Sequence, residues 1–219
     1  MGKKIGVILS GCGVYDGAEI HESVITLLAI DRNGAEAVIC APDVDQMHVI
    51  NHLTGDVVDS EIRNVLVESA RIARGAIRDV KDVSADELDA LILPGGFGAA
   101  KNLCDFAVKG AECEVNPDVA ALVRAVHTQA KPVGAVCIAP ALLAKVLGDV
   151  QPNLTIGNDA DTAGAMESLG AAHVECPVTE FVIDREKKII SSPAYMLAQS
   201  ISDAAEGIEG TVQALIEMA

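Results

Sequence analysis

Short apolar runs alternate with longer segments of helical periodicity from the start of the chain. Residues 3–11, KKIGVILSG, form an apolar run that ends at glycine, and residues 17–34 carry apolar side chains at helical spacing. AEAVICAP (35–42) predicts a second strand, and EIRNVLVESARIARG (61–75) predicts a helix after a polar connection. Strands that alternate with helices in this way predict a parallel sheet.

The second half of the chain repeats this alternation. The predicted strands are LDALILPGG (88–96), VGAV (133–136) and a strand pair with a charged turn within 181–193. The predicted helices are PDVAALVRAVHTQAKP (117–132), IAPALLAKVLG (138–148), DTAGAMESLG (161–170) and most of 195–219, where Gly207 and Gly210 weaken the middle. No repeat or linker interrupts the series.

Composition supports an α/β fold with one core. Half of the 219 residues are apolar, which suffices for one substantial core. The chain has no Trp, two Tyr and three Phe, and small aliphatic residues and glycine dominate, as is typical of close-packed parallel strands and helices. We therefore expect a single domain over residues 1–219.

The charge pattern excludes some classes of partner. The formal net charge is −16 and no cluster of Lys or Arg interrupts it, so the surface repels phosphate backbones and anionic membranes. The first apolar run is only about five residues long, too short for a signal peptide, and no later segment approaches the roughly 18 apolar residues of a membrane span. We expect a soluble, cytoplasmic protein that binds neither nucleic acid nor membrane.

The cysteines carry neither a disulfide pattern nor a zinc pattern. They are scattered, with no CxxC pair and no associated His spacing: Cys12, Cys40, Cys104, Cys113, Cys137 and Cys176. In a chain of this size such spacing predicts free thiols in a reducing compartment and no bound metal.

Cys137 is the thiol with a position suited to chemistry. It follows the predicted strand VGAV and begins the predicted helix, so it lies at a carboxyl strand end, where open α/β sheets form their sites. The flanking Ala135 and Ala139 are small, as a sharp nucleophile-bearing turn requires, and the helix start favours a thiolate. The alternative is that Cys137 is a small buried filler.

The glycine pair Gly95-Gly96 ends another predicted strand, in LPGG. Consecutive glycines can bring backbone N–H groups close to a substrate oxygen and stabilise a developing negative charge. An ordinary tight turn explains the same residues equally well.

Together these motifs resemble a known superfamily. GAExxE (Gly17, Ala18, Glu19 and Glu22), LPGG and VCIAP resemble the ThiJ/PfpI group of the class I glutamine-amidotransferase-like superfamily. A closer resemblance is to the ElbB family, associated with isoprenoid biosynthesis, and five blocks between residues 10 and 199 carry it: SGCGVYDGAEIHE, INHLTGD, PGGFGAAKNL, CIAPALL and SPAYMLAQ.

The resemblance implies a fold and a set of site residues. The fold is a flavodoxin-like, three-layer α-β-α sandwich with a mostly parallel sheet. Cys137 is the nucleophile, and Glu22 is the acid that touches its sulfur. A protonated Glu22 donates to the thiolate, which lowers the thiol pKa, and moves a proton during turnover. Glu19, one turn earlier, is the second choice, and a solvated glutamate is the alternative for Glu22. Gly95, Gly96 and Ile138 supply backbone oxyanion donors.

One residue departs from the peptidase-like members of the group. Those members follow the nucleophile with His, whereas this chain has Ile138, so we do not expect amide or peptide cleavage. His21 adjoins Glu22 but points about 100° away along the helix. His52, in INHLTGD, is a packed loop histidine or a site residue; the sequence leaves both open.

Two functions remain. The resemblance to ElbB proteins implies a glyoxalase of the hydro-lyase type that needs no glutathione, metal or other cofactor and converts a small dicarbonyl, glyoxal, to glycolate, with repair of glycated amines as a side activity. The alternative is a non-catalytic redox sensor or partner-binding protein that uses the same thiol. Because members of the superfamily are often dimers, the resemblance also implies a homodimer.

Overall fold

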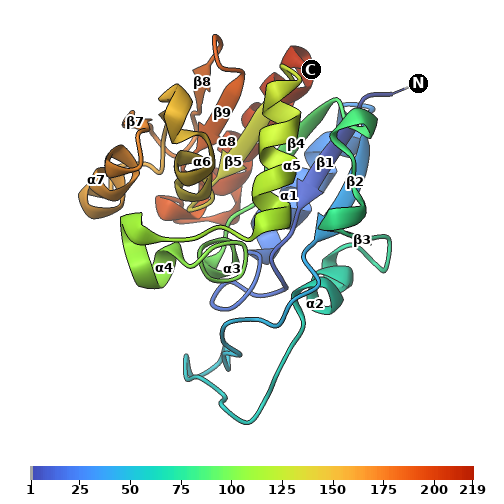
Figure 1. Ribbon diagram of the computed structural model, residues 1–219, viewed down its shortest axis with the longest axis vertical. Helices are drawn as coiled ribbons and strands as arrows, with labels where there is room; N and C mark the ends of the chain where they lie inside the picture. Colours follow the sequence, from blue (N-terminus) through green and yellow to red (C-terminus); the bar gives the residue numbers. More distant parts are fainter. Residues whose placement is uncertain (1) are drawn as a thin grey trace.

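A seven-stranded sheet forms the centre of the protein (Figure 1); the computed structural model describes residues 2–219. Its strand order is β3-β2-β1-β4-β5-β9-β8, and every neighbouring pair is parallel except β8 and β9. The strands are β1 (Lys4–Ile8), β2 (Glu36–Ala41), β3 (Arg78–Asp79), β4 (Ala90–Leu93), β5 (Val133–Val136), β8 (Val182–Asp184) and β9 (Ile189–Ser192). Two short strands, β6 (Asn153–Leu154) and β7 (Ala172–His173), pair separately. The predicted mostly parallel α/β sheet is confirmed.

Helices cover both faces of the sheet and bury an apolar cluster on each. On one face lie α1 (Ile20–Arg32), α2 (Val65–Ile72) and α8 (Ile201–Met218), with α1 packed against α8 (Figure 1). On the other lie α3 (Phe97–Lys101), α4 (Phe106–Lys109), α5 (Pro117–Thr128), α6 (Pro140–Leu147) and α7 (Ala160–Ser168). The strands β4, β5 and β9 are buried throughout, as strands covered on both faces must be. The expected three-layer arrangement is present.

The strand order determines where a site forms. The chain runs outward from β1 to β2 and β3, and then returns to place β4 on the other side of β1. At such a reversal the connections after neighbouring strands leave in opposite directions and open a crevice at the carboxyl strand ends. The turns after β1, β4, β5 and β9 all meet at this edge of the sheet.

The connection between β2 and α2 is longer and more exposed than its polar sequence suggested. It extends away from the sheet (Figure 1), and Leu53 and Ile62 are 94% and 80% exposed. The helix expected over 61–75 begins only at Val65, because the side chain of Asn64 accepts a hydrogen bond from the Val67 N–H and caps it.

The last helix, α8, is continuous through both of its glycines. A Cβ atom at Gly207 would lie 2.5 Å from the Val178 carbonyl oxygen, and one at Gly210 would lie 2.6 Å from the Phe181 ring. These glycines therefore let the segment around residues 178–181 pack directly on the helix, and that contact outweighs their poor helix propensity.

Replacing Gly207 with Ala should destabilise the protein. Ala is normally favoured in a helix by about 1 kcal/mol, but here its Cβ would displace backbone, which costs roughly 1–3 kcal/mol. The matched control is Gly164→Ala in α7, where a Cβ would meet nothing within 4 Å. Denaturant unfolding should show Gly207→Ala less stable and Gly164→Ala more stable than the parent; equal gains in both would contradict the packing role of Gly207.

Candidate active site

Cys137 lies on the turn between β5 and α6 in an unusual backbone conformation. Its φ angle is 60°, in the left-handed region that residues other than glycine rarely adopt. The neighbouring Ala135 and Ala139 are fully buried, and the Cys137 N–H donates to the Ser192 carbonyl at 3.0 Å. Backbone strain of this kind concentrates at functional sites, where surrounding contacts hold it. The side chain of Cys137 is thereby held at the carboxyl edge of the sheet, with only 7% of the residue exposed.

Glu22 lies beside this thiol and is completely buried. One carboxylate oxygen, Oε2, accepts the Gly95 N–H at 2.9 Å, and the other, Oε1, accepts the Tyr195 N–H at 3.2 Å. The carboxyl group also lies beside the Cys137 thiol, because a Cβ atom at Gly95 would lie 2.8 Å from Glu22 Oε2 and 3.0 Å from Cys137 Sγ. Glu22 is presented by the first turn of α1, where Glu19 caps the helix by accepting the Glu22 N–H at 2.7 Å. The structure thus brings together Cys137, Glu22 and Glu19.

Burial controls the protonation of this pair. It raises the pKa of Glu22 to about 7; the nearby Glu19 acts in the same direction, and the hydrogen bonds from Tyr195, Cys137 and Gly95 act against it. Burial also raises the pKa of the Cys137 thiol, and so does the Glu22 carboxyl. The expectation that a protonated Glu22 lowers this thiol pKa concerns the other charge state of the carboxyl, and it stays a prediction. Both directions favour a thiol over a thiolate at Cys137, and they make Glu22 the group whose pKa lies near neutral pH.

The turn after β4 carries Gly95 and Gly96, whose backbone N–H groups are donors to Glu22 and Cys137. A Cβ atom at Gly95 would lie 2.4 Å from the Cys137 Cβ, and one at Gly96 would lie 2.3 Å from the Glu19 nitrogen. Gly95 uses its N–H on Glu22, so that group does not face a substrate oxygen. The N–H groups of Gly96 and Ile138 are directed at the Cys137 sulfur instead. Of the three expected oxyanion donors, Gly95 is engaged by Glu22, whereas Gly96 and Ile138 have their N–H groups beside the thiol.

A cavity of about 430 Å³ opens above the thiol. Loops after β1, β4, β5 and β9 and the start of α7 contribute its walls. The lining residues are Val14, Glu19, Gly96, Phe97, Cys137, Ile138, Asp159, Thr162, Tyr195 and Met196. A cavity of this volume accommodates a small organic molecule.

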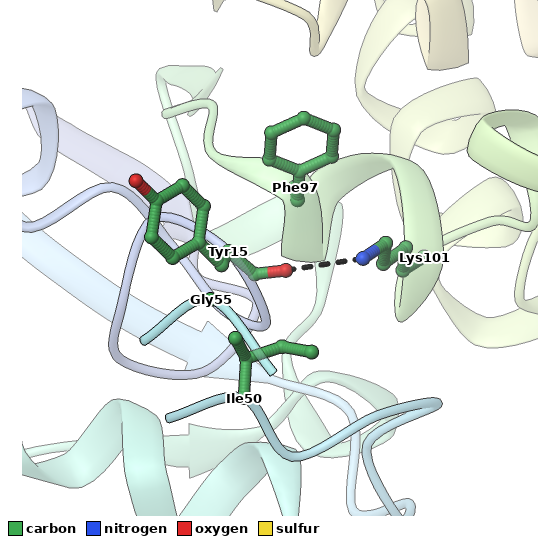
Figure 2. A pocket seen from close by; sticks show the side chains of 5 residues that line it. All are labelled: Tyr15, Ile50, Gly55, Phe97 and Lys101. Carbon is green, nitrogen blue, oxygen red and sulfur yellow. Dashed lines mark hydrogen bonds between the residues drawn. The ribbon is translucent and has the colours of Figure 1, made fainter. Parts of the chain in front are cut away.

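A second hollow, of about 190 Å³, adjoins the first across Phe97. Figure 2 shows Tyr15, Ile50, Gly55, Phe97 and Lys101 around it. The Lys101 ammonium donates to the Tyr15 carbonyl at 3.2 Å and lies 5.1 Å from the centre of the Phe97 ring. Neither Cys137 nor Glu22 lines this hollow, so the reaction cavity is the larger one.

The histidines singled out in the sequence lie outside the reaction cavity. His21 Nδ1 is 2.8 Å from the Tyr195 hydroxyl, which places it behind a lining residue. His52 accepts the Tyr15 N–H through Nε2, at 3.2 Å, and its Nδ1 lies 3.0 Å from the Ile50 carbonyl. Through these two contacts His52 joins the exposed connection to the loop after β1.

Tyr195, Asp159 and Thr162 are site residues that the sequence did not reveal. Tyr195 reaches Glu22 through a backbone N–H, which has no side-chain signature, although its place after the last parallel strand was a usable signal. Asp159 and Thr162 belong to a segment that contains none of the sequence motifs, and only the fold of the chain brings that segment to the cavity.

Two further features are absent from residues 2–219. In that part of the chain no group of three or more His, Cys, Asp or Glu side chains is arranged to hold a metal ion. No helix within it combines the length and the apolar character needed to cross a membrane.

The raised pKa of Glu22 predicts a stability that depends on pH. The folded protein binds this proton more tightly than the unfolded chain does, so the contribution is lost as pH rises from the ordinary value of 4.5 to about 7. Relative to Glu22→Gln, the parent should lose roughly 2 kcal/mol between about pH 5.5 and pH 8, at about 1.4 kcal/mol per pKa unit.

Urea unfolding of both proteins at the two pH values measures this difference. Both carboxylate oxygens of Glu22 accept a backbone N–H. In Glu22→Gln the amide NH2 group would face one of these N–H donors and lose that hydrogen bond, but the resulting loss of stability is the same at each pH. Glu36→Gln, on the exposed edge of β2, serves as the control. A difference between parent and Glu22→Gln that does not change with pH would contradict the raised pKa.

Comparison with known proteins places the chain among relatives that share its whole length. It is 46% identical over 98% of its length to human (Homo sapiens) "Glutamine amidotransferase-like class 1 domain-containing protein 3, mitochondrial", covering 83% of that protein. It is 35% identical over 88% of its length to "ES1 protein, mitochondrial" of Danio rerio, covering 76% of it. Both relatives are named as mitochondrial, which overturns the expectation of a cytoplasmic protein.

A solved structure agrees closely with this fold. The isoprenoid biosynthesis protein with amidotransferase-like domain from Ehrlichia chaffeensis superposes with a TM-score of 0.91 at 35% identity, covering 99% of this chain and 100% of that one. Residues 12–192, which include Glu22, Gly95 and Cys137, match the DJ-1/PfpI family. On the match of these residues and of the fold, the chain belongs to the DJ-1/PfpI family.

Proposed function

We propose that this protein is a cofactor-independent glyoxalase that converts glyoxal to glycolate at Cys137, within an ElbB-like branch of its family. The observation that carries the proposal is the buried Glu22 carboxyl, with a pKa of about 7, beside a thiol that lines a small cavity. A group with a pKa near the working pH is the most effective general acid and base. The name of the Ehrlichia protein supports the ElbB-like branch.

The first step joins the thiol to one aldehyde carbon. As the sulfur–carbon bond forms, the Cys137 proton passes to the Glu22 carboxylate and then to the new oxygen, which gives a neutral hemithioacetal. The N–H groups of Gly96 and Ile138, directed at the sulfur, lie where they stabilise the oxygen while it is negative. Because the proton leaves sulfur only during attack, the raised thiol pKa does not prevent the reaction.

The second step moves hydrogen between the two carbons. Glu22 removes the proton from the carbon bonded to sulfur, the electrons form an enediol, and Glu22 returns a proton to the second carbon. The first carbon is thereby oxidised to a thioester and the second is reduced to an alcohol, so no external oxidant is needed. Water then adds to the thioester and releases glycolate and the free thiol.

Amide cleavage fits this site poorly. A Cys protease or amidase needs a base that also protonates an amine leaving group, usually His. Ile138 occupies the position after the nucleophile, and the residues lining the cavity include no histidine. Addition of a thiol to an aldehyde has no amine leaving group and therefore needs no such base.

A redox sensor is also less well supported. Oxidation-sensitive thiols are accessible and have a low pKa. Cys137 is 7% exposed, and burial raises its pKa. The geometry therefore favours a thiol that is activated by a substrate over one that reacts directly with oxidants.

Loss of Cys137 should abolish glyoxal turnover. Cys137→Ala removes the attacking atom, and Glu22→Gln should lower kcat by at least about 100-fold because proton transfer is lost. Among the cysteines of residues 2–219, Cys12 is the one that is not buried, and Cys12→Ser should leave turnover unchanged. Glycolate formation by purified protein measures all three; Cys137→Ala with the activity of the parent would exclude the mechanism.

The enediol step predicts the origin of one hydrogen in the product. A proton held on Glu22 exchanges with solvent, so turnover in D2O should place deuterium on the alcohol carbon of glycolate. Proton NMR of the product reads this directly. Glycolate that retains both original hydrogens on that carbon would show a direct hydride shift and contradict the role of Glu22.

A further inference from the structure

The polar groups that line the reaction cavity are acidic or neutral. Glu19 and Asp159 contribute carboxylates, Thr162 and Tyr195 contribute hydroxyls, and no lining residue is Lys or Arg. Glu19 is 8% exposed and its carboxylate is held in place by the Glu22 N–H at 2.7 Å. Carboxylates in a partly enclosed cavity repel anions more strongly than the same groups do in open water.

The start of α7 does not offset these charges. A helix N-terminus ordinarily attracts anions through its free N–H groups. Here the Asp159 carboxylate caps the helix by accepting the Thr162 N–H at 2.8 Å. The N-terminus of α7 is therefore occupied by the Asp159 carboxylate, and Asp159 itself lines the cavity.

Lys101, His21 and Glu22 are charged or titratable groups near the cavity that do not line it. Lys101 lines the neighbouring hollow, where its ammonium is engaged with the Tyr15 carbonyl and lies 5.1 Å from the centre of the Phe97 ring (Figure 2). His21 lies behind Tyr195, at 2.8 Å from its hydroxyl. Glu22 lies beneath Cys137 and adds a further acidic group.

We infer that Asp159 and Glu19 select the substrates of this site by charge. Neutral and ammonium-bearing carbonyl compounds reach Cys137, whereas small carbonyl compounds that carry a carboxylate or a phosphate are rejected. Asp159 is the specificity-determining residue, because it is exposed at the wall and Asn can replace it as a helix cap. As a statement about substrates, the inference rests on the proposed function; as a statement about access to the thiol, it stands without it.

Charged thiol reagents test access directly. Methanethiosulfonates with a trimethylammonium group or a sulfonate group differ in charge but transfer to sulfur by the same chemistry. Mass spectrometry of the peptide that carries Cys137 gives the rate with each reagent, normalised to a small neutral thiol in solution. We expect the cationic reagent to react roughly tenfold faster than the anionic one, and high salt to reduce this ratio.

Paired variants separate the cavity wall from the overall charge of −16. Asp159→Asn should reduce the cation-to-anion ratio at least about threefold, since one nearby carboxylate is lost. Asp161→Asn removes the same charge from the same helix at a residue that does not line the cavity, and should leave the ratio close to that of the parent. Equal ratios in the two variants, or faster reaction with the anionic reagent, would overturn the inference.

Substrate pairs distinguish this inference from the proposed function. Methylglyoxal is neutral, whereas 4,5-dioxopentanoate carries a carboxylate. We expect kcat/KM to be at least about tenfold higher for methylglyoxal, and we expect Asp159→Asn to reduce the ratio of the two kcat/KM values. Turnover of both compounds at equal rates would overturn the charge selection. No turnover of either compound, with the reagent ratios as expected, would remove the glyoxalase function and leave the selective cavity standing.

Discussion

The burial of one carboxyl group, Glu22, is the constraint on which the site depends. Each of its oxygens accepts a backbone N–H, one from Gly95 after β4 and one from Tyr195 after β9, and the group also touches the thiol of Cys137. A buried carboxyl is costly unless such partners surround it. Four separate turns at the edge of the sheet must therefore be in register before this group can be buried.

The same burial explains the chemistry of the site. Removing Glu22 from water raises its pKa to about 7, which makes it a proton carrier at neutral pH rather than a fixed charge. A thiol next to it keeps its proton for the same reason, and it loses that proton only when a carbonyl carbon accepts the sulfur. Glu19 and Asp159 then surround the reacting atoms with negative charge, so the cavity that activates the thiol also restricts what reaches it.

The sequence predicted the framework of this site better than its protonation. Alternating apolar runs and helical segments predicted the parallel sheet, because buried strands need uniformly apolar residues, and the small neighbours of Cys137 predicted the turn that carries it. The raised pKa of the Cys137 thiol was not predicted, because it depends on burial, which no single motif encodes. Gly95 was expected to face a substrate, and its bond to Glu22 follows from a contact between segments 73 residues apart. The expectation of a cytoplasmic protein was also wrong, because the composition of the chain does not distinguish one compartment from another.

Infrared spectroscopy of the resting protein tests the central claim, that Glu22 and not Cys137 titrates near neutral pH. The carboxylic acid band that is absent from Glu22→Gln and the S–H band that is absent from Cys137→Ala identify the two groups. As pH rises through about 7, the account predicts that the Glu22 acid band disappears while the Cys137 S–H band persists. Loss of the S–H band with the acid band still present would show a thiolate beside a protonated Glu22 and contradict the account.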